Sequence, residues 1–312
     1  MTKLLGYIAV VFLFACQTRY FSETYSNTEN QKNAKKIVRL DLSNQQLEVL
    51  PKDILDYTNL QFINLSNNPK LKLDSAFEVL ASFPSLKFVR LDSNNIIDLP
   101  SNIKKLIQLT HISLVYNPEF DIEENINKMG EVHNLTTLNF SHCNIQEIPK
   151  NISTLKQLRN LRLSHNKINT ANSFNHLSGI EKLKFLWLDN NQIKQLPSAI
   201  GNLKQVIELY LDDNQLSALP ESIEQCENMC ILYLGNNQFE EIPEQIMDMK
   251  MMYMLVLYNN KIKTIPEKFA HTKAPLAVLV MDKNRLSETE IKTAINYFKG
   301  FFLFSTKNQQ VN

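Results

Sequence analysis

The chain has 312 residues, and its 33 lysine and arginine residues nearly balance 32 aspartate and glutamate residues. No basic run is present to attract a phosphate backbone, so we do not expect nucleic acid as a partner. The six glycines form no phosphate-binding loop, and no Ser/His/Asp set is apparent. We therefore expect neither an enzyme nor a cofactor.

Residues 1–16 have the layout of a secretory signal peptide. Lys3 precedes a run of about a dozen mostly apolar residues, which is short for a membrane span of about 20. The following Leu13-Phe14-Ala15-Cys16 resembles a bacterial lipobox, although Phe14 is larger than the usual residue there. The resemblance implies that Cys16 is acylated and anchors the protein to a membrane without spanning it. An uncleaved signal anchor or an ordinary apolar leader is the alternative.

Residues 17–36 are polar and show no hydrophobic period, so we expect a flexible tether. This segment would hold the rest of the chain off the membrane surface.

A repeated apolar pattern then runs from Ile37 to Leu286. The segment Val206–Asn228, VIELYLDDNQLSALPESIEQCEN, shows it as LxxLxLxxNxLxxLP, and the next residue starts it again. Successive units begin 23 to 26 residues apart, and the eleven starting positions are Ile37, Leu60, Leu86, Leu109, Leu135, Leu158, Leu183, Val206, Met229, Met252 and Leu276. The ninth position is Asn in nine of the units, whereas it is Gln45 in the first and Cys143 in the fifth. The pattern is similar to the 23-residue class of leucine-rich repeat proteins.

Each unit is expected to form one strand, as in Leu209-x-Leu211, whose apolar side chains point to one face. Such strands stack side by side because none of them buries its apolar face alone. A column of Asn side chains then satisfies the backbone groups of the turns. The fold class is therefore α/β: a right-handed leucine-rich repeat solenoid, or horseshoe, with a parallel sheet on its concave face. We expect a single domain over 37–286.

The return path of the 23-residue units contains Leu-Pro or Ile-Pro, which predicts short 3₁₀ or polyproline segments. Three longer units carry helical spacing of apolar residues instead, and we expect α-helices there. The first lies after Asn68, with Asp74 or Ser75 as N-cap; the others lie over Asp121–Glu131 and around Phe174 and Leu177.

Residues 287–312 are predicted to cap the last unit. Ser287-x-x-Glu290 has the spacing of a capping box and is followed by an apolar helical face, so we expect a helix over Ser287–Lys299. Three aromatic residues complete the lid: Phe301, Phe302 and Phe304.

The outward strand positions, which are the third, fifth and seventh of each unit, carry the functional information. From the seventh unit onward they become aromatic, with Asp189 and Asp212 on one rim. Aromatic side chains with charges nearby are typical of binding hot spots, although aromatic pairs also stabilise strands. We predict that a partner contacts Phe185, Trp187, Glu208, Tyr210, Tyr233, Met254 and Tyr258.

Two other groups of residues carry side chains that can bind metal or form a disulfide. His142 and His165 occupy the eighth position of adjacent units but have no aligned third ligand, so we predict no metal site. Cys226 and Cys230 are four residues apart across a unit boundary. We expect free thiols there, with a disulfide as the alternative.

The resemblance implies protein–protein interaction, since leucine-rich repeat proteins are dominated by that role. We therefore expect a non-catalytic, monomeric lipoprotein of the bacterial cell envelope, at the outer membrane or cell surface, that presents its concave face to a protein. A secreted protein is the alternative for its location. A carbohydrate-binding envelope protein is the alternative for its function, because aromatic platforms also stack on sugars.

Overall fold

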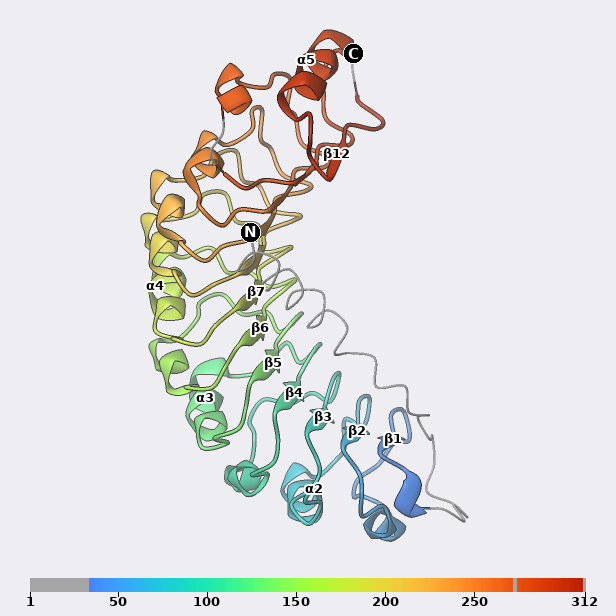
Figure 1. The fold of residues 1–312 in the computed structure, drawn as a ribbon. Helices are drawn as coiled ribbons and strands as arrows, with labels where there is room; N and C mark the ends of the chain where they lie inside the picture. Colours follow the sequence, from blue (N-terminus) through green and yellow to red (C-terminus); the bar gives the residue numbers. More distant parts are fainter. Residues whose placement is uncertain (1–33, 272–273, 311–312) are drawn as a thin grey trace.

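The computed structural model describes residues 34–271 and 274–310. Over this part, the chain forms an open arc in which parallel strands line the inner side and helical segments line the outer side (Figure 1). Cys16, the predicted signal peptide and residues 17–33 of the predicted tether lie outside the described residues. Within them, no helix combines the length and the apolar character that a membrane span requires.

The described residues contain one sheet of twelve strands that follow one another in chain order. Each strand has three residues and pairs in parallel with the strand one repeat away. The central residue is buried in β1 to β11 and partly buried in β12. The strands are β1 (Arg39–Asp41), β2 (Phe62–Asn64), β3 (Phe88–Arg90), β4 (His111–Ser113), β5 (Thr137–Asn139), β6 (Asn160–Arg162), β7 (Phe185–Trp187), β8 (Glu208–Tyr210), β9 (Ile231–Tyr233), β10 (Met254–Val256), β11 (Val278–Val280) and β12 (Leu303–Ser305). Eleven of these strands coincide with the predicted units, which confirms the fold class.

The ninth-position Asn residues form the predicted column of hydrogen bonds. Asn214 is typical of them: its Oδ1 accepts from the backbone N–H groups of Asn191 and Ile193, both at 3.0 Å. Its Nδ2 donates to the carbonyls of Leu188 and Leu211, also at 3.0 Å. Cys143 replaces Asn in this column, and its thiol donates to a carbonyl of an earlier repeat at 3.1 Å. The column thus satisfies backbone groups that water does not reach.

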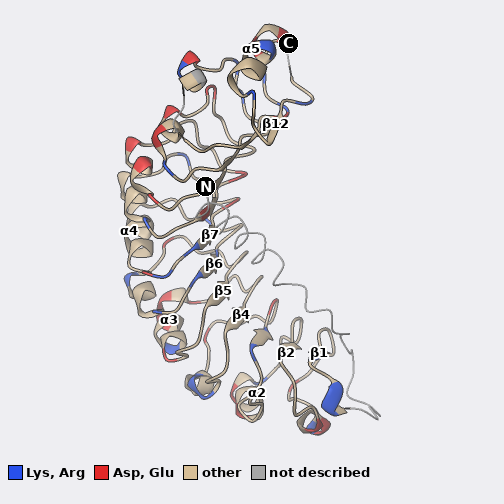
Figure 2. Cartoon of the chain, in the orientation of Figure 1, with Lys and Arg blue, Asp and Glu red and all other residues tan. Residues whose placement is uncertain are grey.

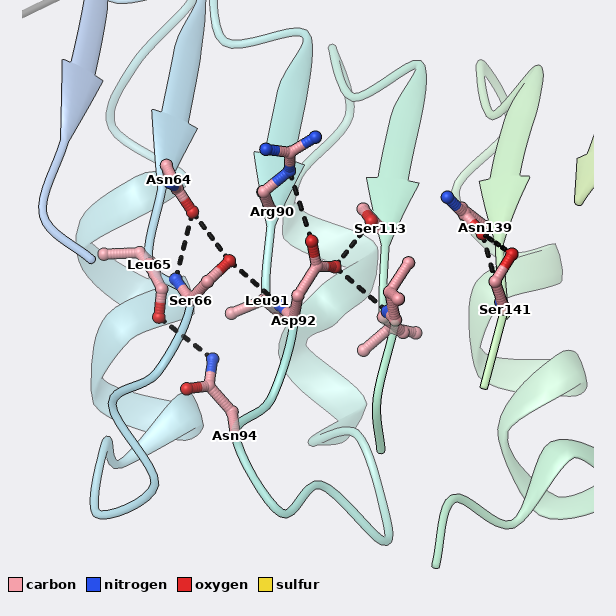
Figure 3. A network of polar contacts seen from close by, with 12 residues as sticks. Asn64, Leu65, Ser66, Arg90, Leu91, Asp92, Asn94, Ser113, Asn139 and Ser141 are labelled. Carbon is pink, nitrogen blue, oxygen red and sulfur yellow. Dashed lines mark hydrogen bonds and ion pairs between the residues drawn. The ribbon is translucent and has the colours of Figure 1, made fainter. Parts of the chain in front are cut away.

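The seventh position forms the rim at which the chain leaves the concave face, and its N–H groups need acceptors. Asp92 supplies one of them, because its Oδ1 accepts from Val115 N at 2.9 Å and from the Ser113 hydroxyl at 2.5 Å (Figure 3). Where the fifth position is Asn64, that side chain accepts from Ser66 N at 3.1 Å instead. A rim aspartate therefore has a structural role before any binding role is considered.

The outer side of the arc combines 3₁₀ segments with three α-helices, as predicted. The 3₁₀ segments η2 to η7 each follow a proline, since proline has an extended backbone and no N–H to pair. The 3₁₀ segments are η1 (Ala34–Lys36), η2 (Lys52–Asp56), η3 (Ser101–Lys105), η4 (Lys150–Thr154), η5 (Ser198–Asn202), η6 (Glu221–Gln225), η7 (Glu244–Asp248) and η8 (Glu267–His271). The three α-helices are α2 (Leu73–Leu80), α3 (Ile122–Gly130) and α4 (Ala171–Ser178).

The predicted N-cap of α2 is wrong. The helix begins at Leu73, so Asp74 and Ser75 lie inside its first turn, and Lys72 occupies the N-cap position without a side-chain hydrogen bond. The carbonyl of Lys72 accepts the N–H of Ala76 at 3.0 Å. This earlier start brings Ala76, Phe77 and Leu80 into the core.

The C-terminal segment contains the predicted helix and one strand that was not predicted. Helix α5 (Glu288–Tyr297) is capped by the Ser287 hydroxyl, which accepts from Glu290 N at 3.2 Å. The following β12 pairs with β11, and Gln309 takes the role of the ninth-position Asn. Its side chain accepts from Leu286 N at 3.1 Å and donates to the Met281 carbonyl at 2.8 Å.

The predicted aromatic lid is formed in part. The rings of Phe301 and Phe304 lie 4.9 and 5.0 Å from the ring of Phe298, whereas Phe302 is 85% exposed. The thiols of Cys226 and Cys230 are free and buried, so the alternative of a disulfide between them is not realised.

Candidate functional site

An aromatic stack runs across strands β6 to β9 at the fifth position of each repeat. Because the strands are paired in register, Arg162, Trp187, Tyr210 and Tyr233 lie side by side. The rings of Trp187 and Tyr210 are 4.9 Å apart and nearly parallel, and those of Tyr210 and Tyr233 are 4.4 Å apart. The guanidinium of Arg162 lies 4.5 Å above the Trp187 ring. We call these four residues the aromatic ladder.

The three aromatic residues of the ladder are half-buried. Each internal ring covers the face of its neighbour, so that the faces of Tyr210 are occupied on both sides. What the ladder offers to a partner is therefore a row of ring edges rather than open ring faces. The positive edge of an aromatic ring favours contact with carbonyl and carboxylate oxygens.

Two of the predicted contact residues are buried, so the expectation that all strand positions of this region face solvent is wrong for them. Phe185 is 9% exposed and Glu208 is 6% exposed. Both occupy the third position, where Glu208 lies between Phe185 and Ile231 in the sheet register. Large neighbours on both sides, together with Ile207 at the second position, shield this column from solvent.

The carboxylate of Glu208 is held by the aromatic ladder. The Tyr210 hydroxyl donates to Glu208 Oε2 at 2.7 Å. Burial raises the pKa of Glu208 above its usual range, and this hydrogen bond opposes the shift. Burial and the adjacent Glu208 carboxylate together raise the pKa of Tyr210, so its hydroxyl stays protonated and remains a donor.

On the opposite flank of the ladder, the rim carries three aspartates. Asp212 Oδ1 accepts from Gly235 N at 2.6 Å, which is the structural role that Asp92 has in an earlier repeat. Burial raises the pKa of Asp212 to about 7, and the carboxylates of Asp213 and Asp189 act in the same direction. These three residues, Asp189, Asp212 and Asp213, are called the acidic rim below. Elsewhere the charges of both signs are interspersed along the outer side of the arc (Figure 2).

The last two predicted contact residues lie beyond the ladder. Met254 is half-buried and packs against the small apolar cluster of Ile207, Cys230 and Ile231. The hydroxyl of Tyr258 accepts from Asn236 Nδ2 at 3.0 Å, which places the tyrosine at the rim. Burial, followed by the charges of the three rim aspartates, raises the pKa of Tyr258 to about 12.

A second aromatic run, which the sequence did not single out, lies at the other end of the concave face. Phe62 and Phe88 meet edge to face at 5.0 Å, and Phe88 stacks on His111 at 5.4 Å. The guanidinium of Arg39 lies 4.0 Å above the Phe62 ring. These residues share the third position of consecutive repeats, so reading that column separately from the fifth and seventh would have found them.

The two histidines considered as metal ligands are brought together by the fold. The rings of His142 and His165 stack at 4.1 Å, and Tyr116 stacks on His142 at the same distance. Within the described residues, no group of three or more His, Cys, Asp or Glu side chains is placed to hold a metal ion. The pair is an aromatic stack at the rim, and it supports no metal proposal.

Residues 139–258 match a family described as a leucine-rich repeat region. No curated protein sequence matches the chain. Among solved structures, a leucine-rich repeat protein of Leptospira interrogans is 26% identical, with a TM-score of 0.66 over 93% of this chain and 83% of that one.

Two further structures share the fold. An internalin of Listeria monocytogenes is 19% identical, with a TM-score of 0.63 over 90% of this chain and 84% of that one. A chain from the Toll–Spatzle complex of Drosophila is 20% identical, with a TM-score of 0.64 over 87% of this chain and 38% of that one. The arc of strands described above is thus the same architecture that these proteins use.

Proposed function

We propose, from the premise that this chain is a leucine-rich repeat protein, that it binds a protein partner through the C-terminal half of its concave face. The contact surface consists of the edges of Trp187, Tyr210 and Tyr233 together with Met254 and Tyr258. Phe185 lies beneath this surface, and Glu208 lies at its edge with 6% of its area exposed. In this proposal the protein is a binding module without catalytic activity.

The observation that carries the proposal is the ordered stack of large aromatic rings on one face of an open sheet. Tyrosine and tryptophan supply large contact areas with few rotatable bonds, which is why they dominate binding hot spots. Stacking on both neighbours already restricts the rotamers of Tyr210. Binding then costs little further side-chain entropy, so contacts made by the ladder contribute more fully to affinity.

The alternative of carbohydrate binding is not favoured by this geometry. A sugar ring stacks with its C–H groups on the face of an aromatic ring, whereas the faces of Tyr210 are covered by Trp187 and Tyr233. The other alternative is that the ladder only stabilises the sheet through cross-strand pairs. Such pairs contribute to stability in either case, so the experiment has to measure binding.

Site-specific photo-crosslinking in intact cells tests the proposal. A photoreactive phenylalanine analogue at position 233 should capture a discrete protein, and the double variant Trp187→Ser/Tyr210→Ser should abolish the capture. The matched control carries the analogue at Ile107, which is 63% exposed but lies outside the strands. Equal capture from both positions, or capture that survives the double substitution, would contradict the proposal.

We also propose that Cys16 carries a lipid that anchors a monomeric protein to the bacterial cell envelope, with secretion as the alternative. The proposal is supported by the lipobox-like residues Leu13 to Cys16 and by the bacterial origin of two of the structures that share the fold. Labelling of cells with a palmitate analogue should mark the protein, and Cys16→Ser should remove the label. Unchanged labelling in that variant would exclude the anchor, and light scattering on the purified protein checks the monomer.

A further inference from the structure

Glu208 is a largely buried carboxylate with one oxygen hydrogen bonded and the other still within reach of the surface. An ionised carboxylate has two oxygens that together accept about four hydrogen bonds. Glu208 is 6% exposed, and the hydrogen bond that the structure gives it comes from the neutral hydroxyl of Tyr210. None of the ion pairs within 4.0 Å among the described residues involves Glu208.

Such a group is costly to the folded protein. A carboxylate removed from water without a positive partner loses hydration that one neutral hydrogen bond does not replace. The raised pKa of Glu208 expresses the same deficit. A positive group brought to this position from outside would offset the cost, and complementary charges across an interface contribute to specificity.

The second carboxylate group lies across the ladder. Glu208 and Asp212 occupy the third and seventh positions of the same repeat, which places them about 13 Å apart along the extended backbone. No ion pair among the described residues involves the acidic rim. Arg162, the cation of the ladder, is stacked on Trp187 instead. From there it interacts electrostatically with Asp189 of the rim, but not within the 4.0 Å of an ion pair. The ladder is thus an aromatic ridge with carboxylates on both flanks that form no ion pair.

An apolar cluster adjoins the Glu208 flank. Ile207, Cys230 and Ile231 pack together, and Tyr233, Met251 and Met254 pack partly buried against them. A partner that places a positive charge at Glu208 would therefore place the neighbouring side chain near Tyr233 and Met254, which are partly exposed residues over this cluster. Nucleic acid does not meet this requirement, because its phosphates would face the carboxylates.

We propose that this face recognises a basic segment of the protein partner, in which a lysine or arginine next to an aliphatic or aromatic residue contacts Glu208. A second positive charge of the segment contacts the acidic rim. The inference rests on the proposed function and adds the chemistry of the partner to it. Its support is the match between two features: an apolar surface flanked by carboxylates that form no ion pair, and a segment that is both apolar and cationic.

A metal ion does not fit the arrangement of Glu208 and the acidic rim. Among the described residues, no cluster of three or more His, Cys, Asp or Glu side chains is placed to coordinate one. Glu208 and the acidic rim lie on opposite sides of the ladder, so they cannot share a single ion. A flexible side chain of a polypeptide reaches each group separately.

The test selects peptides from a random twelve-residue display library on the full-length protein and sequences those that are enriched. The charge variant Glu208→Gln/Asp212→Asn keeps an acceptor for the Tyr210 hydroxyl and for Gly235 N–H, so we expect it to fold. The matched control Glu221→Gln/Glu224→Gln removes the same charge from the exposed outer segment η6. Thermal unfolding followed by circular dichroism verifies that both variants are folded.

We expect the enriched peptides to carry lysine or arginine beside an aliphatic or aromatic residue. A synthetic consensus peptide should bind the charge variant about tenfold more weakly, or worse, than the wild type, and should bind the matched control equally well. Enrichment of neutral or acidic peptides, or equal affinity for the charge variant, would overturn the inference.

The same selection separates this inference from the proposed function. Some peptides could lose binding to Trp187→Ser/Tyr233→Ser but bind the charge variant as well as the wild type. That result would support the proposed function and contradict the inference of a basic partner. Peptides that bind Trp187→Ser/Tyr233→Ser as well as they bind the wild type would count against both, and so would the absence of any enrichment.

Discussion

The ring of Tyr258 lies directly against the backbone of Gly235, one repeat earlier. A Cβ built on Gly235 would stand 2.1 Å from Tyr258 Cε1, far inside van der Waals contact. Glycine at the seventh position therefore makes the space that Tyr258 occupies at the rim. The arrangement also brings the tyrosine hydroxyl within 3.0 Å of Asn236 Nδ2.

The substitution Gly235→Ala should displace the Tyr258 ring and lower the free energy of unfolding by about 1–3 kcal/mol. Urea unfolding measures this cost. In a Tyr258→Ala background the same substitution meets no ring, so it should be nearly neutral. An equal cost in both backgrounds would show that the ring is not the obstacle.

We predict that replacing one Asn of the column lowers the free energy of unfolding substantially. In Asn214→Ala, the N–H groups of Asn191 and Ile193 lose their acceptor in the core, and the free energy of unfolding should fall by about 3 kcal/mol. Asn214→Cys should cost less, because the thiol of Cys143 already donates to a carbonyl in this column.

Asn172→Ala is the matched control, since Asn172 lies on the exposed side of α4, and it should change stability by less than about 0.5 kcal/mol. If Asn214→Ala and Asn172→Ala lowered the free energy of unfolding by the same small amount, the hydrogen bonds of the column would not stabilise the fold as we infer.

Asp212 predicts a dependence of stability on pH. Its pKa rises from 3.8 to about 7 on folding, so between these values the folded protein binds more protons at this site than the unfolded chain. Its contribution to stability therefore falls as pH rises from about 4 to about 7. The nearby carboxylates that act in the same direction belong to Asp213 and Asp189.

The variant Asp212→Asn removes this penalty while keeping an acceptor for Gly235 N–H. Its melting temperature should exceed that of the wild type by about 2 °C or more at pH 8. The difference should become smaller at pH 5 and approach zero only near the unfolded pKa of 3.8. A difference that is the same at both pH values would argue against a raised pKa of Asp212.

The role of Gln309 is checked by hydrogen exchange. Gln309→Ala removes the acceptor of Leu286 N and a donor to the Met281 carbonyl, so β12 should open more readily than β8. Amides of residues 303–305 should exchange about tenfold faster or more, with those of residues 208–210 unchanged. Unchanged exchange over 303–305 would mean that β12 does not depend on this side chain.

The sequence alone predicted the framework of this protein, because the information for it is local and repeated. Leucines at fixed spacing identify the strands, and an Asn or Cys143 after each of ten of them identifies the turn that needs its hydrogen bonds. The short helices α3 and α4 follow from apolar spacing within a single unit. The same reasoning failed at β12. There Phe301 and Phe304 stand at apolar positions that usually hold leucine, and Gln309 stands at the position that usually holds Asn.

The tertiary structure decided which outward positions are open to a partner. The sequence treats Phe185 and Trp187 alike, as aromatic residues of one strand, yet Phe185 is buried and Trp187 is half-buried. It also cannot show that Glu208 is enclosed by neighbours from two other repeats, or that Tyr210 reaches back to hold it. Burial and unpaired charge depend on side chains that meet across strands, at separations of 23 residues or more along the chain. The repeat pattern therefore determines where the concave face lies, and packing across the strands determines what that face offers to a partner.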